Sequence, residues 1–564
     1  MRWLVPWLLV ASSAACDEPQ ANAEPTDAKP AVEEDADAPE EPASPSADAE
    51  DEPDTAEPTP DPEAKPADYG SIALSVPRPK PEELTLHALA GFTIVAVYAE
   101  PNLESEHLGY LRMGQRMMVT PKVDDAGEGC KDGFHALASG GFACASKGLI
   151  VDAEKEPFMH RPPPPPQADQ PVPYDYAVIA RDGAAMWWRV PTSEELALAQ
   201  LRWDNTIGKV KREEAAKKAA EKAAKEDRPI GDGEAVADAE QPEDVRPTDD
   251  DLPRLPGAKL DAETEAARIE AEKKKLAELE VQWNKLPLQP DRPFLEKGNM
   301  ISIGSKVVEN GHVFWRTARG GYVEARYTYR YGPKDFQGGE ITEEAVAAFG
   351  FVWDENSAPA HRMLESGKLK WESKLEHRAL VVGVEEATVE DRDYLVTKDG
   401  LYVRKKQLRM AEKQPRPEEV APWERWIDVD LEKQILVAYE GDRPVYATLV
   451  STGRKGTKEE SFRTPKGTFR IRSKHISSSM AGSTATDGDY SIQDVPWAMF
   501  FEGNYALHGA FWHSRFGNVR SHGCVNLGPT DARWLFNFAT PFLPEGWHGV
   551  SAHEGSPGTL VVVR

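Results

Sequence analysis

Cys524 is the residue of this sequence best placed to do covalent chemistry. It lies in the run Ser521-His522-Gly523-Cys524-Val525-Asn526, and His508 precedes it by sixteen residues. A thiol needs a nearby base to act as a nucleophile at neutral pH, because its usual pKa is about 8.5. A separation of this length lets His508 occupy a neighbouring strand and face back. We therefore predict that Cys524 is a nucleophile and that His508 takes its proton and later returns it to the leaving group.

Other residues near Cys524 could shape the reaction site. His522 lies two residues before Cys524, so on an extended chain the two side chains point to the same side, where the imidazole could share in proton transfer. Gly523 permits a sharp turn whose amides, together with that of Cys524, could hold an oxyanion. Trp512 and Tyr505 are candidates for the walls of a substrate site, although aromatic residues at such positions are core residues about as often.

A zinc site is the alternative use of the same side chains. His508, His522 and Cys524 are suitable ligand types, but no further acidic residue or histidine accompanies them at a recognisable spacing. The sequence therefore favours the nucleophile, and we expect neither a bound metal nor another cofactor.

The N-terminus predicts export. It has one positive charge and a short apolar run that ends in Ser13-Ala14-Ala15-Cys16, which is typical of a cleaved signal and too short to span a bilayer. The segment resembles the lipobox of bacterial lipoproteins, which implies cleavage before Cys16 and lipid on its sulfur. Several acyl chains would anchor the protein to a membrane. An ordinary secreted protein is the alternative.

Cys130 and Cys144 are the remaining pair. Thirteen residues separate them, and in an oxidising compartment we predict a disulfide between them, with two buried free thiols as the alternative. Cys524 is then left without a partner, and an unpaired thiol in an exported protein indicates reactivity.

Residues 17–68 form an acidic segment. They contain nineteen Asp and Glu and two Lys, a net charge of −17 within the total of −28. Because Pro and Ala fill the remaining positions, little apolar surface can be buried, and we predict a disordered, self-repelling tether. This charge argues against nucleic acid as a partner.

Beyond the tether, short apolar runs broken by glycine predict small β-rich modules, and hence a mostly β, multidomain fold. Three segments place two aromatic residues eight positions apart around a glycine turn: Phe134 and Phe142, Phe314 and Tyr322, Tyr394 and Tyr402. These segments resemble the closing hairpins of bacterial SH3-like barrels. The predicted modules span residues 70–152, 174–335 and 336–412, with a Pro-rich linker at 153–173. Unrelated antiparallel domains are the alternative.

Residues 192–288 interrupt the second module with helical patterns. Thr192-Ser193-Glu194-Glu195 forms a capping box, and residues 213–227 are almost wholly Ala, Lys and Glu. In a second helical segment, apolar residues recur at helical spacing and form a stripe: Ile269, Leu276, Leu279, Trp283 and Leu286. We predict a helical hairpin, packed through this stripe, with residues 229–256 as a loose acidic loop.

Residues 424–564, about a quarter of the chain, carry the motifs with the clearest family resemblance. The segments are Val450-Ser-Thr-Gly453, Thr464-Pro-Lys-Gly-Thr-Phe469 and the run from His508 to Ser521-His-Gly-Cys-Val-Asn526. Together they resemble the catalytic domain of the YkuD-type L,D-transpeptidase family. The resemblance implies a β-sandwich-like catalytic fold and a substrate in the peptidoglycan stem peptide.

The resemblance also implies residue roles. Cys524 would attack the carbonyl between the third stem residue and the terminal D-Ala and leave a thioester. The backbone carbonyl of Gly509 would orient the ring of His508. Ser521 and Asn526 match signature positions, which implies that they hold the loop and contact substrate.

A lid is expected at residues 475–489, because this family has one there and the segment is rich in Ser, Gly and Thr, a composition that suits a mobile polar cover. The acyl acceptor stays open. A second stem peptide would give a 3→3 cross-link, a free D-amino acid would give exchange, a protein lysine would give wall attachment, and water would make the enzyme a carboxypeptidase. A non-catalytic wall-binding lipoprotein is a further alternative. We expect a membrane-anchored protein that faces the periplasm or cell wall.

Overall fold

The computed structural model describes residues 78–226, 270, 274 and 277–564, apart from gaps at 125–126, 128, 160–161, 291, 333–335, 343–344, 354–356, 457–460 and 485–487. The predicted signal with Cys16, the acidic tether, the loop at 229–256 and the positions Ile269 and Leu276 lie outside the described residues. Among the helices that are described, none has both the length and the apolar character needed to cross a membrane.

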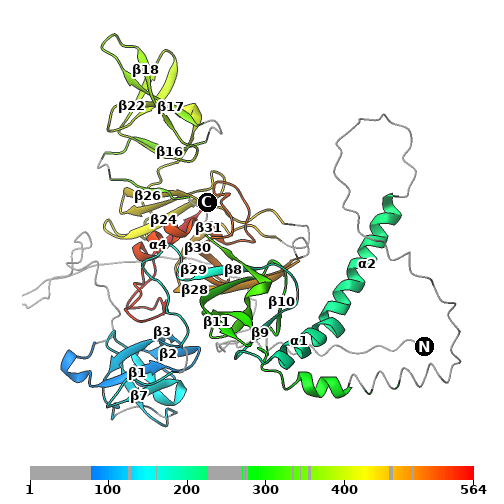
Figure 1. Cartoon of the computed structure of the whole chain (residues 1–564). Coiled ribbons are helices and arrows are strands. Elements are labelled where there is room, and N and C mark those ends of the chain that lie inside the picture. Colours follow the sequence, from blue (N-terminus) through cyan, green and yellow to red (C-terminus); the bar gives the residue numbers. More distant parts are fainter. Residues whose placement is uncertain are drawn as a thin grey trace, which may run out of the picture. The chain divides into compact units, whose positions relative to one another are not determined.

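Strands in several sheets are the main regular structure of the described residues, which confirms the predicted fold class (Figure 1). Four regions are named below by their residues: the first module (78–152), the second module (174–331), the third module (348–410) and the C-terminal domain (424–564). The SH3-like class of the modules and the predicted domain boundaries stay predictions.

The first module has seven strands and two short 3₁₀ turns. They are η1 (Pro81–Glu83), β1 (Leu86–Ala90), β2 (Ile94–Tyr98), β3 (His107–Arg112), β4 (Arg116–Val119), β5 (Phe134–Ala136), β6 (Phe142–Cys144), η2 (Ala145–Lys147) and β7 (Leu149–Asp152). Strand β1 lies between β4 and β7, and β2 pairs with β3 and β6. A disulfide joins Cys130 to Cys144 at the end of β6.

The second module contains the helical insertion. Its elements are β8 (Asp175–Ile179), β9 (Ala184–Trp187), α1 (Ser193–Asn205), α2 (Ile207–Glu226), β10 (Phe294–Leu295), β11 (Met300–Glu309), β12 (His312–Thr317), β13 (Tyr322–Glu324), η4 (Ala325–Tyr327) and β14 (Thr328–Tyr331). The predicted capping box is present, because Thr192 Oγ1 accepts the Glu195 amide and Glu195 Oε2 accepts the Thr192 amide. Residues 277–283 are also helical, and Arg202 of α1 donates to the Trp283 carbonyl at 3.4 Å.

The third module consists of short strands. They are β16 (Ala348–Val352), β17 (Ala358–Met363), β18 (Leu369–Leu375), β19 (Leu380–Gly383), β20 (Glu385–Val389), β21 (Arg392–Val396), β22 (Leu401–Arg404), η5 (Lys405–Gln407) and β23 (Leu408–Met410). Strand β15 (Gly339–Glu340), which follows the predicted start of this module at residue 336, pairs with β26 of the C-terminal domain. Phe336 and Ile341 are buried in that domain's core, which explains why this segment joins it.

The three predicted aromatic hairpins share one register. In the first module, Phe134 pairs with Cys144 and Ala136 pairs with Phe142. The same offsets recur in the other two modules, in the pairs Phe314↔Glu324 and Arg316↔Tyr322, and Tyr394↔Arg404 and Val396↔Tyr402. Residues directly opposite in antiparallel strands share a face, so both rings of each hairpin lie on one side.

The turns of these hairpins are also alike. In the first, the Leu137 amide donates to the Gly141 carbonyl and the Gly140 amide donates to the Leu137 carbonyl; residues 317–321 and 397–401 repeat both bonds. The glycine at the fourth turn position has φ of +97° at Gly140, +80° at Gly320 and +74° at Gly400. Glycine reaches this left-handed region without steric cost, which explains why it occupies the same position each time. The repeat in the sequence is thus a repeat of backbone structure.

The C-terminal domain is built from two sheets and a helix. Its elements are β24 (Arg425–Asp430), β25 (Ile435–Glu440), β26 (Arg443–Leu449), β27 (Gly467–Arg470), β28 (Ser473–Thr484), β29 (Gly488–Glu502), β30 (Tyr505–Gly509), β31 (Val525–Leu527), α4 (Pro529–Phe538), β32 (Gly549–Ser551) and β33 (Leu560–Val563). One sheet has the order β15-β26-β25-β24-β33-β27, and the other contains β32-β28-β29-β30-β31.

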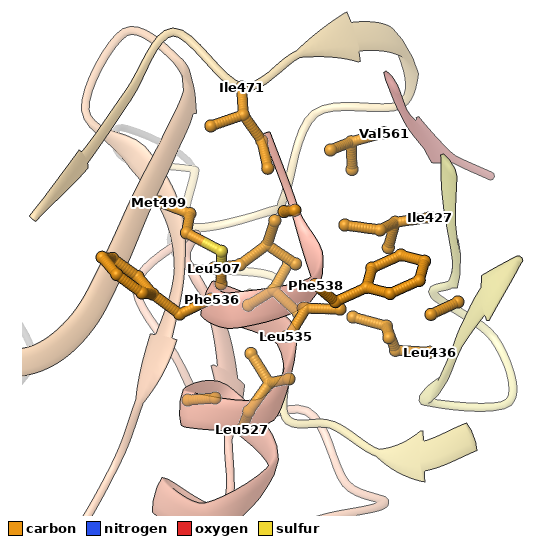
Figure 2. Close-up of a cluster of buried hydrophobic side chains, with 14 of the residues drawn as sticks. Ile427, Leu436, Ile471, Met499, Leu507, Leu527, Leu535, Phe536, Phe538 and Val561 are labelled. Carbon is orange, nitrogen blue, oxygen red and sulfur yellow. The ribbon is translucent and has the colours of Figure 1, made fainter. Parts of the chain in front are cut away.

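The core of this domain lies between the two sheets and α4 (Figure 2). Ile427 and Val561 come from one sheet, Met499 and Leu507 come from the other, and Leu535 comes from α4. Trp426, which precedes Ile427 in β24, faces the opposite side of the sheet and packs in a second core that contains Phe336 and Phe351. This sheet is buried on both faces, and its inner face packs against Leu507 of β30 and Val525 of β31, the strands that carry the site.

Candidate active site

The predicted site residues of the C-terminal domain gather at one cavity of about 950 Å³. This volume is near the upper end of the usual range for ligand sites, about 300–1,000 Å³. Its lining includes all of the predicted nucleophile, base and wall residues of the domain except Gly523: Cys524, His508, His522, Ser521, Asn526, Trp512 and Tyr505.

Strands β30 and β31 bring Cys524 and His508, the predicted nucleophile and base, together. They run parallel, with Leu507 opposite Val525 and His508 opposite Asn526, and Cys524 directly precedes β31. His508 and Cys524, sixteen positions apart in the sequence, thus lie in or directly beside two neighbouring strands, as the spacing predicts. His508 Nδ1 lies 3.1 Å from the Gly509 carbonyl oxygen and donates to it, which leaves the Nε2 lone pair of the neutral ring as the proton acceptor. The ring of Trp512 stacks on His508.

Burial keeps both reacting groups neutral in the resting site. It lowers the pKa of His508 to about 4, against the hydrogen bond to Gly509, which raises it. It also raises the pKa of the Cys524 thiol to about 11, and the thiol lies 3.7 Å from the Asn504 carbonyl oxygen. A neutral imidazole can accept a proton, so the arrangement suits proton transfer that accompanies attack by sulfur, rather than a preformed thiolate.

The turn before Cys524 depends on Gly523. Its φ is +124°, and a Cβ there would lie 2.4 Å from Cε1 of Tyr505, so any side chain would clash. Thr464 Oγ1 donates to the Gly523 carbonyl at 2.7 Å, and Ser521 Oγ donates to the Cys524 carbonyl. The bond from Ser521 thus joins the two ends of the turn, and its predicted role in holding the loop stays a prediction.

The Gly523 amide, a predicted oxyanion donor, has a hydrogen-bond partner within its own turn. This amide donates to Ser521 Oγ at 3.1 Å, so it is already engaged within the turn. The Cys524 amide is the remaining predicted donor. The spacing alone could not show that the Ser521 hydroxyl competes for the first amide.

His522 and Asn526 contact neighbours that the sequence did not single out. Arg454 donates to His522 Nε2 at 2.9 Å, and the ring of Phe462 packs edge-on against the imidazole at 4.8 Å. Asn526 Nδ2 lies 3.0 Å from His513 Nε2. His522 is thus oriented by a cation, while Asn526 lines the cavity from a buried position.

Two arginines in the cavity were missed by sequence reasoning. Arg454 and Arg520 both line it and give it positive charge that complements carboxylates. Arg454 directly follows the Val450–Gly453 motif, and Arg520 directly precedes Ser521. Their position next to motif residues is the signal that could have found them.

The wall opposite the loop is the hairpin of β28 and β29. Ser479, Met480 and Ala481 from β28 and Ser491 and Ile492 from β29 line the cavity. The prediction of a mobile polar cover from residue 475 onward is wrong for the start of that segment. Residues 473–484 form a strand, Ile476 and Ser477 are buried, and β28 pairs with both β29 and β32.

Two arginines of the third module bind the loop that leads to Cys524. Arg378 donates to the Ser514 carbonyl at 2.6 Å. Arg409 donates to the carbonyls of Gly517 and Lys433 and lies over the ring of Trp353. We refer to residues 510–523 as the catalytic loop. Sequence patterns could not reveal these contacts, because they join separate regions.

Within the part of the chain that the structure describes, no group of three or more His, Cys, Asp and Glu side chains is arranged to hold a metal ion. His522, one of the three side chains of the alternative zinc site, instead contacts Arg454 and Phe462.

Comparison with known proteins confirms the family resemblance of the C-terminal domain. Residues 424–563 match the family model of the L,D-transpeptidase catalytic domain (YkuD). A putative L,D-transpeptidase, YciB of Bacillus subtilis, is 28% identical over 127 residues, which are 20% of this chain and 59% of that protein. The chain thus spans less than two thirds of that relative.

Solved structures of L,D-transpeptidases are also similar. One from Xylanimonas cellulosilytica has 26% identity and covers 27% of this chain and 64% of its own, with a TM-score of 0.19. One from Mycobacterium smegmatis has 17% identity and covers 47% of this chain and 95% of its own, with a TM-score of 0.20.

Proposed function

We propose that this protein is a peptidoglycan L,D-transpeptidase that acts through a thioester on Cys524. The observation that carries the proposal is that the domain matching the L,D-transpeptidase family places Cys524 and His508 on adjoining segments of one cavity. Arg454 and Arg520 support a peptide substrate with free carboxylates, because guanidinium groups bind carboxylates well.

The proposed reaction has two steps. Cys524 Sγ attacks the carbonyl carbon between the third stem residue and the terminal D-Ala, while its proton passes to His508 Nε2. The C–N bond then breaks, His508 returns the proton to the departing amine, and D-Ala leaves. In the second step an amine attacks the thioester carbon, an amide forms and the thiol is restored. A second stem peptide as this amine gives a 3→3 cross-link, a protein lysine gives wall attachment, and water gives L,D-carboxypeptidase activity.

The proposed location is the outer side of a membrane. Lipidated Cys16 would anchor the chain and residues 17–68 would be the tether, so the enzyme would act on the wall within reach of that tether. Globomycin treatment of producing cells tests the anchor: accumulation of uncleaved precursor supports it, and unchanged processing contradicts it.

Replacement of the nucleophile tests the reaction. Cys524→Ala should abolish formation of the thioester with a stem tetrapeptide, and of the acyl adduct with a carbapenem, in mass spectra of the intact protein. Turnover should fall at least about a thousandfold, as for loss of other catalytic nucleophiles. A normal adduct on the Ala variant would contradict the proposal.

Binding to sacculi separates catalysis from simple wall binding. The Cys524→Ala variant should bind sacculi as the unmodified protein does while leaving the muropeptides unchanged. In the active protein, 3→3 dimers, tripeptides or lysine-linked fragments identify the acceptor. If the active protein changes no muropeptide and forms no adduct, the chain is a wall-binding protein.

A further inference from the structure

The cavity that holds Cys524 is not built from the C-terminal domain alone. Gly298 and Met300, from the second module, line it together with His508 and Cys524. Met300 begins strand β11, and it lies opposite Ile492 of β29 in a parallel pairing of the two strands. The second module thus reaches the cavity at the point where it meets the β28–β29 hairpin.

The side chains at this end of the cavity are largely apolar. Met300 from the second module shares it with Met480 and Ile492 from the hairpin, whereas Arg454 and Arg520 line the same cavity near the catalytic loop. An apolar surface favours aliphatic parts of a ligand, and cations favour its carboxylates.

Asp494 lies two residues beyond Ile492 and connects the hairpin to both modules. Its carboxylate is fully buried, with 0% exposure. Arg112 of the first module lies 2.8 Å from Oδ1, and Arg319 of the second module lies 3.5 Å from it. Ser302 of the second module donates to Oδ2.

The backbone of Asp494 is held as well. Tyr176 of the second module donates to its carbonyl at 2.6 Å, and the Asp494 amide donates to Oγ of Ser479, which lines the cavity, at 3.3 Å. Its φ of +53° is uncommon for residues other than glycine, although aspartate tolerates it better than most. So many partners on one residue fix the hairpin in a single position relative to β11.

Asp494 itself does not belong to the described lining of the cavity. It can act on the cavity through Ser479, to which its amide donates, and through Ile492, which pairs with Met300. A buried carboxylate between two arginines cannot shift without leaving charges unpaired, so it resists displacement of either strand.

We propose that the second module supplies one wall of the substrate site, for an aliphatic part of the stem peptide, and that Asp494 is the positioning residue that seats the hairpin against this wall. The identity of the substrate rests on the proposed function; the shared wall does not.

Two variants test this inference, one on the wall and one on the positioning residue. Met300→Trp fills the cavity from the second module, and Asp494→Asn removes the charge while keeping the shape. Asp428→Asn is the matched control, because Asp428 is 1% exposed and pairs with Arg564 at 3.0 Å but does not line the cavity. Kinetics with a stem tetrapeptide and alkylation of Cys524 by iodoacetamide and by a bulky pyrenyl maleimide are measured for each.

Met300→Trp should raise KM at least about tenfold with kcat within about threefold, since it removes binding without touching the reacting groups. It should also slow the bulky maleimide relative to iodoacetamide. Asp494→Asn should raise KM and speed the bulky reagent relative to the small one, because the hairpin is released. Asp428→Asn should change neither KM nor the ratio of the two alkylation rates.

An unchanged KM and alkylation ratio in Met300→Trp would overturn the shared wall. If Met300→Trp behaves as expected but a folded Asp494→Asn matches the control, Asp494 is not a positioning residue. Should Asp494→Asn fail to fold, Ser302→Ala, which removes one hydrogen bond to the carboxylate, takes its place with the same expected direction. If the protein does not act on the peptide at all yet Met300→Trp shifts the alkylation ratio, the proposed function fails and the shared wall stands.

Discussion

The two walls of the cavity are held by different interactions. On the hairpin side, Arg112 and Arg319 pair with the buried carboxylate of Asp494. On the side of the catalytic loop, Arg378 and Arg409 instead donate to backbone carbonyls. Burial lowers the pKa of Arg378 and of Arg409. In contrast, Asp494 raises the pKa of Arg112 against the lowering effect of burial. The paired charges fix the hairpin strongly in one arrangement. The bonds to carbonyl acceptors hold the catalytic loop, which leads to Cys524, less tightly.

Replacement of an arginine should therefore lower the free energy of unfolding most on the hairpin side. Arg112→Ala leaves the buried carboxylate of Asp494 with a single cation, Arg319, which lies farther away than Arg112 does. Truncation of one partner of a buried ion pair lowers stability by about 3–5 kcal/mol. Urea unfolding at pH 7 measures the loss. Arg112→Lys keeps the charge and should lose clearly less. A loss below about 1 kcal/mol in Arg112→Ala would put this pair in the range of surface salt bridges and remove the contrast between the walls.

Loss of an arginine on the loop side should cost less stability but more turnover. Arg409→Ala removes hydrogen bonds to two carbonyls, but Arg409 is only half-buried and water can take its place, so the total loss should be about 1.5–3 kcal/mol. Because the loop leads directly to Cys524, kcat should fall more than KM rises. A variant whose KM rises with kcat unchanged would show that this wall, too, serves mainly to bind substrate.

Acid should weaken the hairpin wall selectively. Burial alone would raise the pKa of Asp494, but Arg112 and Arg319 hold it well below its usual range. A carboxyl with a folded pKa below its unfolded value of about 3.9 adds stability above that pH, and this stability is lost as the pH falls further. The difference in unfolding free energy between the unmodified protein and Asp494→Asn should shrink below about pH 4, by at most about 1.4 kcal/mol per pH unit.

Two other buried carboxylates, Asp428 and Asp531, have shifts of the opposite sign, so only this difference is informative. Burial raises the pKa of Asp428 and of Asp531 to about 6. Their contribution to stability is fully present below about pH 4 and is lost as the pH rises through 6. Arg409→Ala should keep the pH dependence of the unmodified protein. If it loses the acid response as Asp494→Asn does, the assignment of that response to the hairpin wall is wrong.

The smallest expected effect is on the thiol itself. Because the pKa of Cys524 is raised to about 11, its alkylation by iodoacetamide should still increase with pH above 9 instead of levelling off near neutrality. Asp494→Asn should leave this profile within about twofold, and Arg409→Ala should shift it, because Arg409 holds the catalytic loop that leads to Cys524, whereas Asp494 holds the hairpin wall. A plateau below pH 8 in the unmodified protein would indicate a preformed thiolate.

Local patterns predicted much of the site and of the fold. The spacing of His508 and Cys524 predicted neighbouring strands, and Thr192 and Glu195 form the expected capping box. Glycine turns predicted the three hairpins. Each of these depends on residues close together in the sequence, where periodicity and turn chemistry act directly.

The missed features depend on distant contacts. Tyr176 and Asp494 are 318 residues apart, and no local pattern connects them. Met300 reads as one residue of a strand, and only the pairing with Ile492 takes it to the cavity. The two-residue strand β15 is too short to show an alternating pattern, so its pairing with the C-terminal domain could not be predicted.

The repeated hairpin turn has a consequence for how such a chain can diversify. Its third position is Ser139, Arg319 or Asp399, and the backbone bonds that define the turn do not involve that side chain. Ser139 accepts a hydrogen bond from Trp547 of the C-terminal domain, and Arg319 pairs with Asp494 of the same domain. A duplicated module therefore inherits a fold with one replaceable contact residue, and a single codon change there can give the copy a new docking partner without refolding it.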